Sequence, residues 1–126
     1  MINLLLVSSD DDSLSTLAAA LAKHNDVHVL QERSGAAALE KIAKQNYDLM
    51  ITDENPDDMT GLELIEKIVR INPMINCAAV SSLTPAEFHE ASEGLGLLAQ
   101  LPLRPGVAQA EDILKRLREV ICLTSG

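Results

Sequence analysis

Residues 48–64 read DLMITDENPDDMTGLEL, and this segment predicts the repeating unit of the fold. It opens with DLMIT, whose apolar centre has the length and composition of a strand buried on both faces. An acidic loop follows, and then Thr60 and Glu63 stand three residues apart at the start of an apolar stripe, which is the pattern of a capped helix. A buried strand, a polar loop and an amphipathic helix in succession predict one βα unit of a parallel sheet.

The same unit repeats in both directions along the chain. Strands are predicted over residues 2–7, 27–31, 48–52, 76–80 and 97–103. Each is followed by an amphipathic stretch, with helix caps at Ser34, Thr60 and Thr84 and a last helix over residues 110–123. Pro102 inside the last strand favours an edge position or a bulge. Five βα units predict a single α/β domain over residues 1–126, with no appended output domain and a doubly wound parallel sheet of strand order 2-1-3-4-5.

Composition places the chain among globular proteins. Hydrophobic residues make up 47% and charged residues 23% of the chain, which argues against disorder. No apolar run is long enough for a membrane span and no basic leader precedes a cleavage site, so neither a span nor a secretory signal is expected. Cys77 and Cys122 lie in apolar contexts and are interpreted as small buried hydrophobic residues in a reducing compartment, with a disulfide as the alternative. These features predict a cytoplasmic protein.

The charge distribution is more informative than the composition. Nineteen acids oppose ten bases, and the net charge of −9 argues against direct binding to nucleic acid or to an anionic membrane. Seven acids fall in two short segments, residues 10–12 and 53–58, which follow the first and third predicted strands. These strands are neighbours in the predicted order, so carboxylates from both segments meet at one edge of the sheet. Like charges repel there, and a hard cation such as Mg²⁺ would relieve the repulsion.

Residues 48–64 resemble the phosphoacceptor segment of response-regulator receiver domains of two-component signalling. The shared features are a strand that ends in Asp53, a proline soon afterwards at Pro56, and the later positions Met59, Gly61, Leu62, Glu63 and Leu64. The resemblance covers the whole chain and implies a flavodoxin-like (βα)5 fold in a non-enzymatic signalling module. It implies that Asp53 accepts a phosphoryl group from a histidine kinase or phosphotransfer protein, and that Asp53 and the backbone carbonyl of Asn55 bind Mg²⁺. The alternative for Asp53 is an ordinary turn or helix-capping aspartate.

The acidic pair that receivers carry after their first strand has no unique register in this chain. Val7 is followed by Ser8 and Ser9, and only then by three aspartates. An ungapped match places the pair on residues 8–9, the phase of the following helix prefers residues 9–10, and a slip of two places it on residues 10–11. We expect Asp10 to be a metal ligand and keep Asp11 as a candidate. The alternative is that aspartates at residues 11–12 stabilise a helix N-terminus through its dipole.

Four further receiver positions can be located in this chain, and the residues at two of them depart from the family pattern. Ser81 follows the fourth strand, where receivers place a hydroxyl that follows the phosphoryl oxygen, and Ser82 stands where a small residue guards access to that group. Arg104 precedes Pro105, whereas receivers have a lysine before the proline, often joined by a cis peptide bond. An arginine can hold a phosphoryl group through two hydrogen bonds but is bulkier than lysine and always charged. Leu101 occupies the position of an aromatic switch residue, so any switch must move a leucine or the backbone.

The leading prediction is therefore a receiver that accepts a phosphoryl group on Asp53, with Ser81 and Arg104 contacting it. The alternative is a degenerate receiver that docks to a partner without phosphorylation. A phosphatase of the haloacid-dehalogenase type would need an acid at position 55, where the chain has Asn55. A flavodoxin-like cofactor binder would place a phosphate after the first strand, where the aspartates at residues 10–12 would repel it. A downstream partner or a second copy is expected on an apolar face made by Phe88 and residues 101–103, unless these residues complete the core.

Overall fold

The computed structural model describes residues 1–125, and the side chains of residues 1–122. Five parallel strands form one sheet in the order β2-β1-β3-β4-β5. The strands are β1 (Ile2–Val7), β2 (Val27–Glu32), β3 (Leu49–Thr52), β4 (Asn76–Val80) and β5 (Ala99–Leu101). The order and the parallel pairing confirm the predicted flavodoxin-like fold class, and β5 lies at an edge of the sheet, as its proline suggested.

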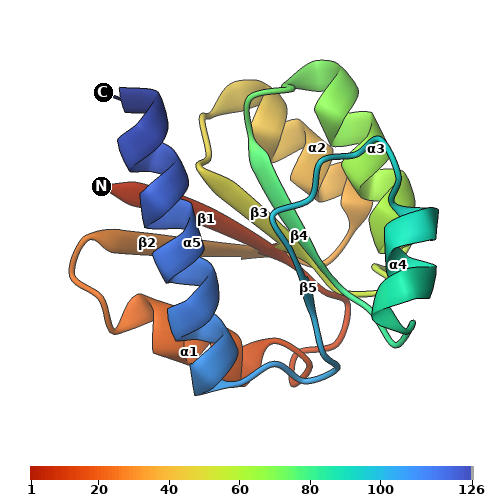
Figure 1. The fold of residues 1–126 in the computed structure, drawn as a ribbon, viewed down its shortest axis with the longest axis horizontal. Helices are drawn as coiled ribbons and strands as arrows, with labels where there is room; N and C mark the ends of the chain where they lie inside the picture. The colour runs from red at the N-terminus through yellow and green to blue at the C-terminus, as the bar shows by residue number, and fades with distance from the viewer. Residues whose placement is uncertain (126) are drawn as a thin grey trace.

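Five helices cover the sheet on both faces (Figure 1). They are α1 (Ser15–Ala22), α2 (Gly35–Lys44), α3 (Gly61–Ile71), α4 (Pro85–Ala91) and α5 (Val107–Ser125). Helices α1 and α5 pack on one face, and α2, α3 and α4 pack on the other, so the molecule has three layers and two apolar cores.

The central strands explain why the sequence reads as continuous apolar runs. In β1, Leu4 and Leu6 belong to the core under α1 and α5, whereas Leu5 and Val7 belong to the core under α2 and α3. All four side chains are at most 1% exposed. A strand covered on both faces needs apolar residues at every position, which is why no alternation of polar and apolar residues is seen.

The predicted helix starts are confirmed by their caps. Ser34 accepts a hydrogen bond from the backbone N–H of Ala37, and Thr60 accepts one from that of Glu63. Thr84 and Glu87 form a complete capping box at the start of α4. These bonds satisfy N–H groups that have no partner within the helix, so short polar signals in the sequence fix the helix boundaries.

Two element boundaries and one burial prediction were wrong. Strand β5 covers only Ala99–Leu101, because Pro102 has no N–H with which to extend the ladder of the predicted strand over residues 97–103. Helix α5 begins three residues earlier than predicted, at Val107. Cys77 is buried, and its burial raises the pKa of the thiol to about 12, but Cys122 is exposed, and both cysteines are free. Within residues 1–125, no helix is both long and apolar enough to cross a membrane.

Candidate functional site

Asp53 is the first residue after β3, and its backbone and side chain are both held in place. Its backbone N–H donates to the carbonyl of Val7 in β1 at 2.8 Å. Its carboxylate accepts two hydrogen bonds, from the backbone N–H of Glu54 to Oδ1 at 2.8 Å and from the hydroxyl of Ser8 to Oδ2 at 2.8 Å. The half-buried side chain therefore sits between the carboxyl ends of β1 and β3, where the strand order reverses and doubly wound proteins place their sites.

Gly61 brings the start of α3 against the backbone of Asp53. A Cβ atom at position 61 would lie 2.5 Å from the carbonyl oxygen of Asp53, which is closer than real Cβ atoms come to any atom. The N–H of Gly61 also donates to the carbonyl of Glu54 at 2.9 Å. Only a glycine fits this contact, so Gly61 in the recognised motif fixes the turn that carries Asp53.

The residue that faces Asp53 from the β1 side is Ser8. Besides contacting Asp53, its hydroxyl oxygen accepts a hydrogen bond from the backbone N–H of Asp10 at 3.1 Å. The structure thus adopts the ungapped register, in which a neutral hydroxyl stands where a second carboxylate was expected. Ser8 was not predicted as a site residue, although the ungapped register was one of the alternatives.

The aspartates at residues 10–12 do not turn toward Asp53. Oδ1 of Asp10 accepts from the backbone N–H of Asp12 at 2.9 Å, and Asp11 forms an ion pair with Arg33. Arg33 also donates to the carbonyl of Ser9 at 2.7 Å. The expectation that carboxylates of this segment converge on Asp53 is therefore not met in the structure. The backbone N–H of Asp12 and the guanidinium of Arg33 engage these two carboxylates instead.

The second acidic segment is also divided among separate partners. Both carboxylate oxygens of Asp58 accept backbone N–H groups at the start of α2, from Gly35 at 2.7 Å and from Ala36 at 3.1 Å. The hydrogen bond from Gly35 is the main cause of a lowered pKa at Asp58, and the bond from Ala36 adds to it. Glu54 instead turns to the loop after β4, where its Oε2 accepts from the backbone N–H of Ser82 at 2.8 Å and from the Ser82 hydroxyl at 2.7 Å. No sequence pattern predicted the contact between Glu54 and Ser82.

The donor set fits Mg²⁺ poorly. The predicted ligands were Asp10, Asp11, Asp53 and the carbonyl of Asn55, but the first two are engaged elsewhere. Across residues 1–125, no group of three or more His, Cys, Asp or Glu side chains is placed to hold a metal ion. Asp53 is met by a hydroxyl, which lacks the negative charge that a hard divalent cation prefers in its ligands. We derive no step through the ion, and the predicted ligand set remains a prediction.

In the described part of the chain, neither Ser81 nor Arg104 forms a hydrogen bond or ion pair with Asp53. Ser81 is buried at the end of β4, where its N–H donates to Leu101 at 3.0 Å and its hydroxyl oxygen accepts from Leu83 at 3.1 Å. Arg104 is exposed, has a positive φ of 51° and precedes Pro105 through a trans peptide bond. In the described part of the chain, its guanidinium makes no hydrogen bond or ion pair. It is a free cation beyond the end of β5.

A cavity of about 460 Å³ opens beside the site, between the loops that follow β3 and β4. Its deeper wall is apolar and includes Leu62, Val80 and Phe88, and its rim includes Glu54 and Ser82. The bond between these two rim residues links the two loops across the cavity.

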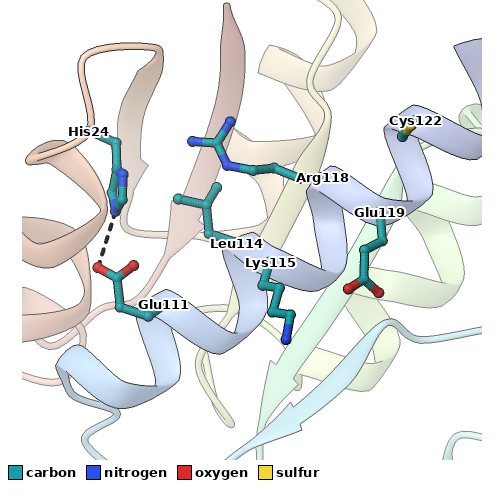
Figure 2. Close-up of a pocket in the computed structure, with 7 residues that line it drawn as sticks. All are labelled: His24, Glu111, Leu114, Lys115, Arg118, Glu119 and Cys122. Atoms are coloured by element: carbon teal, nitrogen blue, oxygen red, sulfur yellow. Dashed lines mark hydrogen bonds and ion pairs between the residues drawn. The ribbon is translucent and has the colours of Figure 1, made fainter.

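A second cavity, of about 360 Å³, lies along α5 on the opposite face of the sheet (Figure 2). His24 and Glu111 approach to 3.1 Å at one end, and Arg118 makes two hydrogen bonds to Asp26, at 2.6 and 3.0 Å. The Arg118 guanidinium lowers the pKa of Asp26 to about 2. These contacts fasten the turn between α1 and β2 to α5, so we assign them a structural role.

The fold is that of a doubly wound α/β protein, and the carboxylate of Asp53 places the candidate site at the carboxyl ends of β1 and β3. A family profile described as "Response regulator receiver domain" matches residues 4–102. The chain therefore belongs to the response-regulator receiver family of two-component systems.

Individual relatives support the same assignment. The chain is 30% identical over 109 residues to "Response regulator receiver protein Anae109_2439" of Anaeromyxobacter sp. (strain Fw109-5), covering 86% of this chain and 45% of that protein. It is 30% identical over 83 residues to "Transcriptional regulatory protein ZraR" of Escherichia coli (strain K12), covering 66% of this chain but 19% of that protein. The chain thus spans less than half the length of either relative. A CheY-like receiver domain from Methanospirillum hungatei JF-1 has the same fold, with a TM-score of 0.81, 23% identity, and coverage of 94% and 95% of the two chains.

Proposed function

We propose that this receiver accepts a phosphoryl group on Asp53 from a histidine kinase or a phosphotransfer protein in the cytoplasm. The observation that carries the proposal is the placement of Asp53. It is a half-buried carboxylate at the crossover of the sheet, oriented by the Glu54 N–H and the Ser8 hydroxyl. Among the acids of the two segments, it is the one that faces this crossover, while Asp11 and Asp58 are engaged in an ion pair and a helix cap.

The proposed step is an in-line phosphoryl transfer. A carboxylate oxygen of Asp53 forms a bond to phosphorus as the bond from phosphorus to the phosphohistidine nitrogen breaks, and that nitrogen keeps the electron pair. The other ring nitrogen of the phosphohistidine carries a proton, so the products are an acyl phosphate on Asp53 and a neutral imidazole on the donor. Negative charge on the equatorial phosphoryl oxygens must be stabilised during transfer. We assign this role to the Ser8 hydroxyl, to Ser81 and to the free guanidinium of Arg104, which stays charged at every physiological pH.

Receiver domains generally bind Mg²⁺ at an acidic pocket. Because the residues around Asp53 in this chain suit the ion poorly, we expect slow phosphoryl acceptance. Downstream, we propose a protein partner or a second copy of the chain on the exposed residues Pro102, Leu103 and Val107. Phe88 and Leu101, which the sequence placed on the same face, are buried and complete the core instead.

A second candidate function is docking without phosphorylation, and one observation favours it. The Ser8 hydroxyl donates to Oδ2 of Asp53, at the position where a second carboxylate was expected. A module of this kind would present the same surface to its partner whether or not a phosphoryl donor is present.

One experiment separates the two functions. The protein is incubated with acetyl phosphate and Mg²⁺, and the gain of one phosphoryl group is followed by intact mass and located by peptide mapping. We expect modification of the wild type and of the Asp57→Asn control, which removes one charge from the same loop, but none of Asp53→Asn. The Asp53→Asn protein should fold normally, because an amide oxygen can still accept from Ser8 or Glu54. Phosphate on Asp53→Asn would refute the assignment, and an unmodified wild type would favour docking.

A further inference from the structure

The loop that follows Asp53 is tied to the loop that follows β4 through one carboxylate oxygen. Oε2 of Glu54 accepts from both the N–H and the hydroxyl of Ser82, at 2.8 and 2.7 Å. The two residues are 28 positions apart, and Glu54 is half buried whereas Ser82 is exposed. Both donors of one residue thus converge on a single charged acceptor, and hydrogen bonds to charged groups are stronger than those between neutral groups.

The rest of the β4–α4 loop is held by β5 and by itself. The N–H of Ser81 donates to Leu101, and the Ser81 hydroxyl accepts from Leu83. The carbonyl of Leu83 accepts from the side chain of Gln100 at 2.8 Å. Ser82 is therefore the residue through which this loop is bonded to the loop that carries Asp53.

Asp53 and Ser82 lie beyond the carboxyl ends of adjacent strands. Thr52 of β3 pairs with Ala79 of β4, so Asp53 is one residue past the end of the β3–β4 pairing. A phosphoryl group on Asp53 extends this side chain outward, and its oxygens need hydrogen-bond donors. The two donors of Ser82 lie at this rim, but Glu54 occupies both, and its carboxylate carries the same sign of charge as an incoming phosphoryl donor.

We infer that Glu54 is an internal competitor of the phosphoryl group. Its carboxylate occupies the Ser82 donors that would otherwise hold phosphoryl oxygens on Asp53, so phosphoryl acceptance requires Glu54 to leave Ser82. Glu54 acts through Ser82 and is a positioning residue. This inference rests on the proposed phosphoryl acceptance by Asp53.

The test compares Glu54→Ala, which removes both the acceptor and the charge, with Glu54→Gln, which keeps an acceptor oxygen and removes only the charge. Glu66→Ala is the matched control, because Glu66 is an exposed glutamate on α3 whose partner is Arg70. Two quantities are measured in each full-length protein. They are the initial rate of Asp53 phosphorylation by acetyl phosphate and Mg²⁺, and the hydrogen-exchange rate of the Ser82 amide without any phosphoryl donor.

Glu54→Ala should raise the phosphorylation rate by at least about threefold, because two donors become free to stabilise phosphoryl charge. Its Ser82 amide should exchange at least about fivefold faster, because the amide has lost its acceptor. Glu54→Gln should also be phosphorylated faster while its Ser82 amide stays protected. Glu66→Ala should match the wild type in both measurements.

Three outcomes would count against this reasoning, and they are distinguishable. Equal Ser82 exchange in wild type and Glu54→Ala would show that the contact does not form in solution and would overturn the inference. Faster exchange with an unchanged or lower phosphorylation rate would show that the contact exists without competing, which also overturns it. If no protein, wild type or variant, takes up phosphate, the proposed function fails, and the competing role of Glu54 fails with it.

Discussion

The Ser8→Asp substitution tests directly whether the hydroxyl at position 8 is what makes this site unsuitable for Mg²⁺. The Ser8 hydroxyl oxygen lies 2.8 Å from Oδ2 of Asp53, so an aspartate at this position places two carboxylates side by side. Two like charges about 4 Å apart repel by about 4 kcal/mol at an effective dielectric constant of about 20. Because Asp53 is only half buried, solvent screening reduces this cost. We expect Ser8→Asp to lose about 1–3 kcal/mol of stability at pH 7 in the presence of a chelator.

Added Mg²⁺ should reverse this loss. A cation that binds only the folded state at a concentration 100 times its Kd stabilises that state by about 2.7 kcal/mol. For a domain of this size, that corresponds to a rise in Tm of about 10 °C. The wild type, with one carboxylate and one hydroxyl, should shift by less than about a third of this value at the same concentration.

The assay is thermal unfolding of the wild type, Ser8→Asp and Ser9→Asp over a Mg²⁺ series at constant ionic strength. Ser9→Asp is the matched control, since it adds the same charge one residue further on, at a position whose carbonyl accepts from Arg33. It should gain no more from Mg²⁺ than the wild type gains. A wild-type shift as large as that of Ser8→Asp would contradict the role assigned to the Ser8 hydroxyl. It would show that Asp10 or Asp11 turns to supply the second carboxylate, as the sequence predicted.

Three other predictions follow from the geometry. Gly61→Ala should destabilise the protein by about 1–3 kcal/mol in urea unfolding, because its Cβ would meet a backbone oxygen at 2.5 Å, whereas Gly106→Ala, whose nearest contact is 3.7 Å, should lose far less. The pKa of Asp26 is held near 2, below its ordinary 3.8, so its ion pair stabilises the fold above about pH 4 and is lost as pH falls through about 2. The Tm difference between the wild type and Arg118→Ala should therefore shrink over that interval, and a constant difference would contradict the assignment. Because Leu101 is buried, partner affinity should change less than about tenfold on phosphorylation, and a hundredfold change in a titration would reveal a switch that these contacts do not contain.

The fold was predictable because its signals are local and agree with one another. The apolar run of β1 is buried on both faces, and the caps at Ser34, Thr60 and Thr84 form as their spacing indicated. Strand β5 was less predictable, because the effect of Pro102 depends on where the ladder stops. Cys122 was misjudged because its apolar sequence context does not reveal that it lies on an exposed side of α5.

The position of Asp53 was predictable because it rests on strand order and on the motif that contains Gly61. The hydrogen-bond and ion-pair partners of the other acidic residues were not predictable. Asp11 is paired with Arg33, which lies 22 residues away, and Asp58 caps a helix that begins 23 residues before it. The sequence predicts that the carboxylates lie at the same edge of the sheet. It does not predict which hydrogen-bond donor or cation each carboxylate binds.

The distribution of these partners bears on how the protein can respond to a phosphoryl group. The two acidic segments do not combine into one strongly negative pocket, because an ion pair, a turn and a helix cap engage the carboxylates of Asp11, Asp10 and Asp58. If Asp53 is phosphorylated as proposed, the single negative charge of its carboxylate is replaced by about two on the acyl phosphate, a net gain of about one negative charge. Among the groups that can stabilise this charge, the Ser8 hydroxyl is bonded to Asp53, and the two donors of Ser82 are bonded to Glu54. Leu101 is packed in the core, so it has little room to move. We therefore expect a response to phosphorylation to start as an exchange of hydrogen-bond partners between the β3–α3 and β4–α4 loops. The backbone hydrogen bond from Ser81 to Leu101 connects the second of these loops to β5.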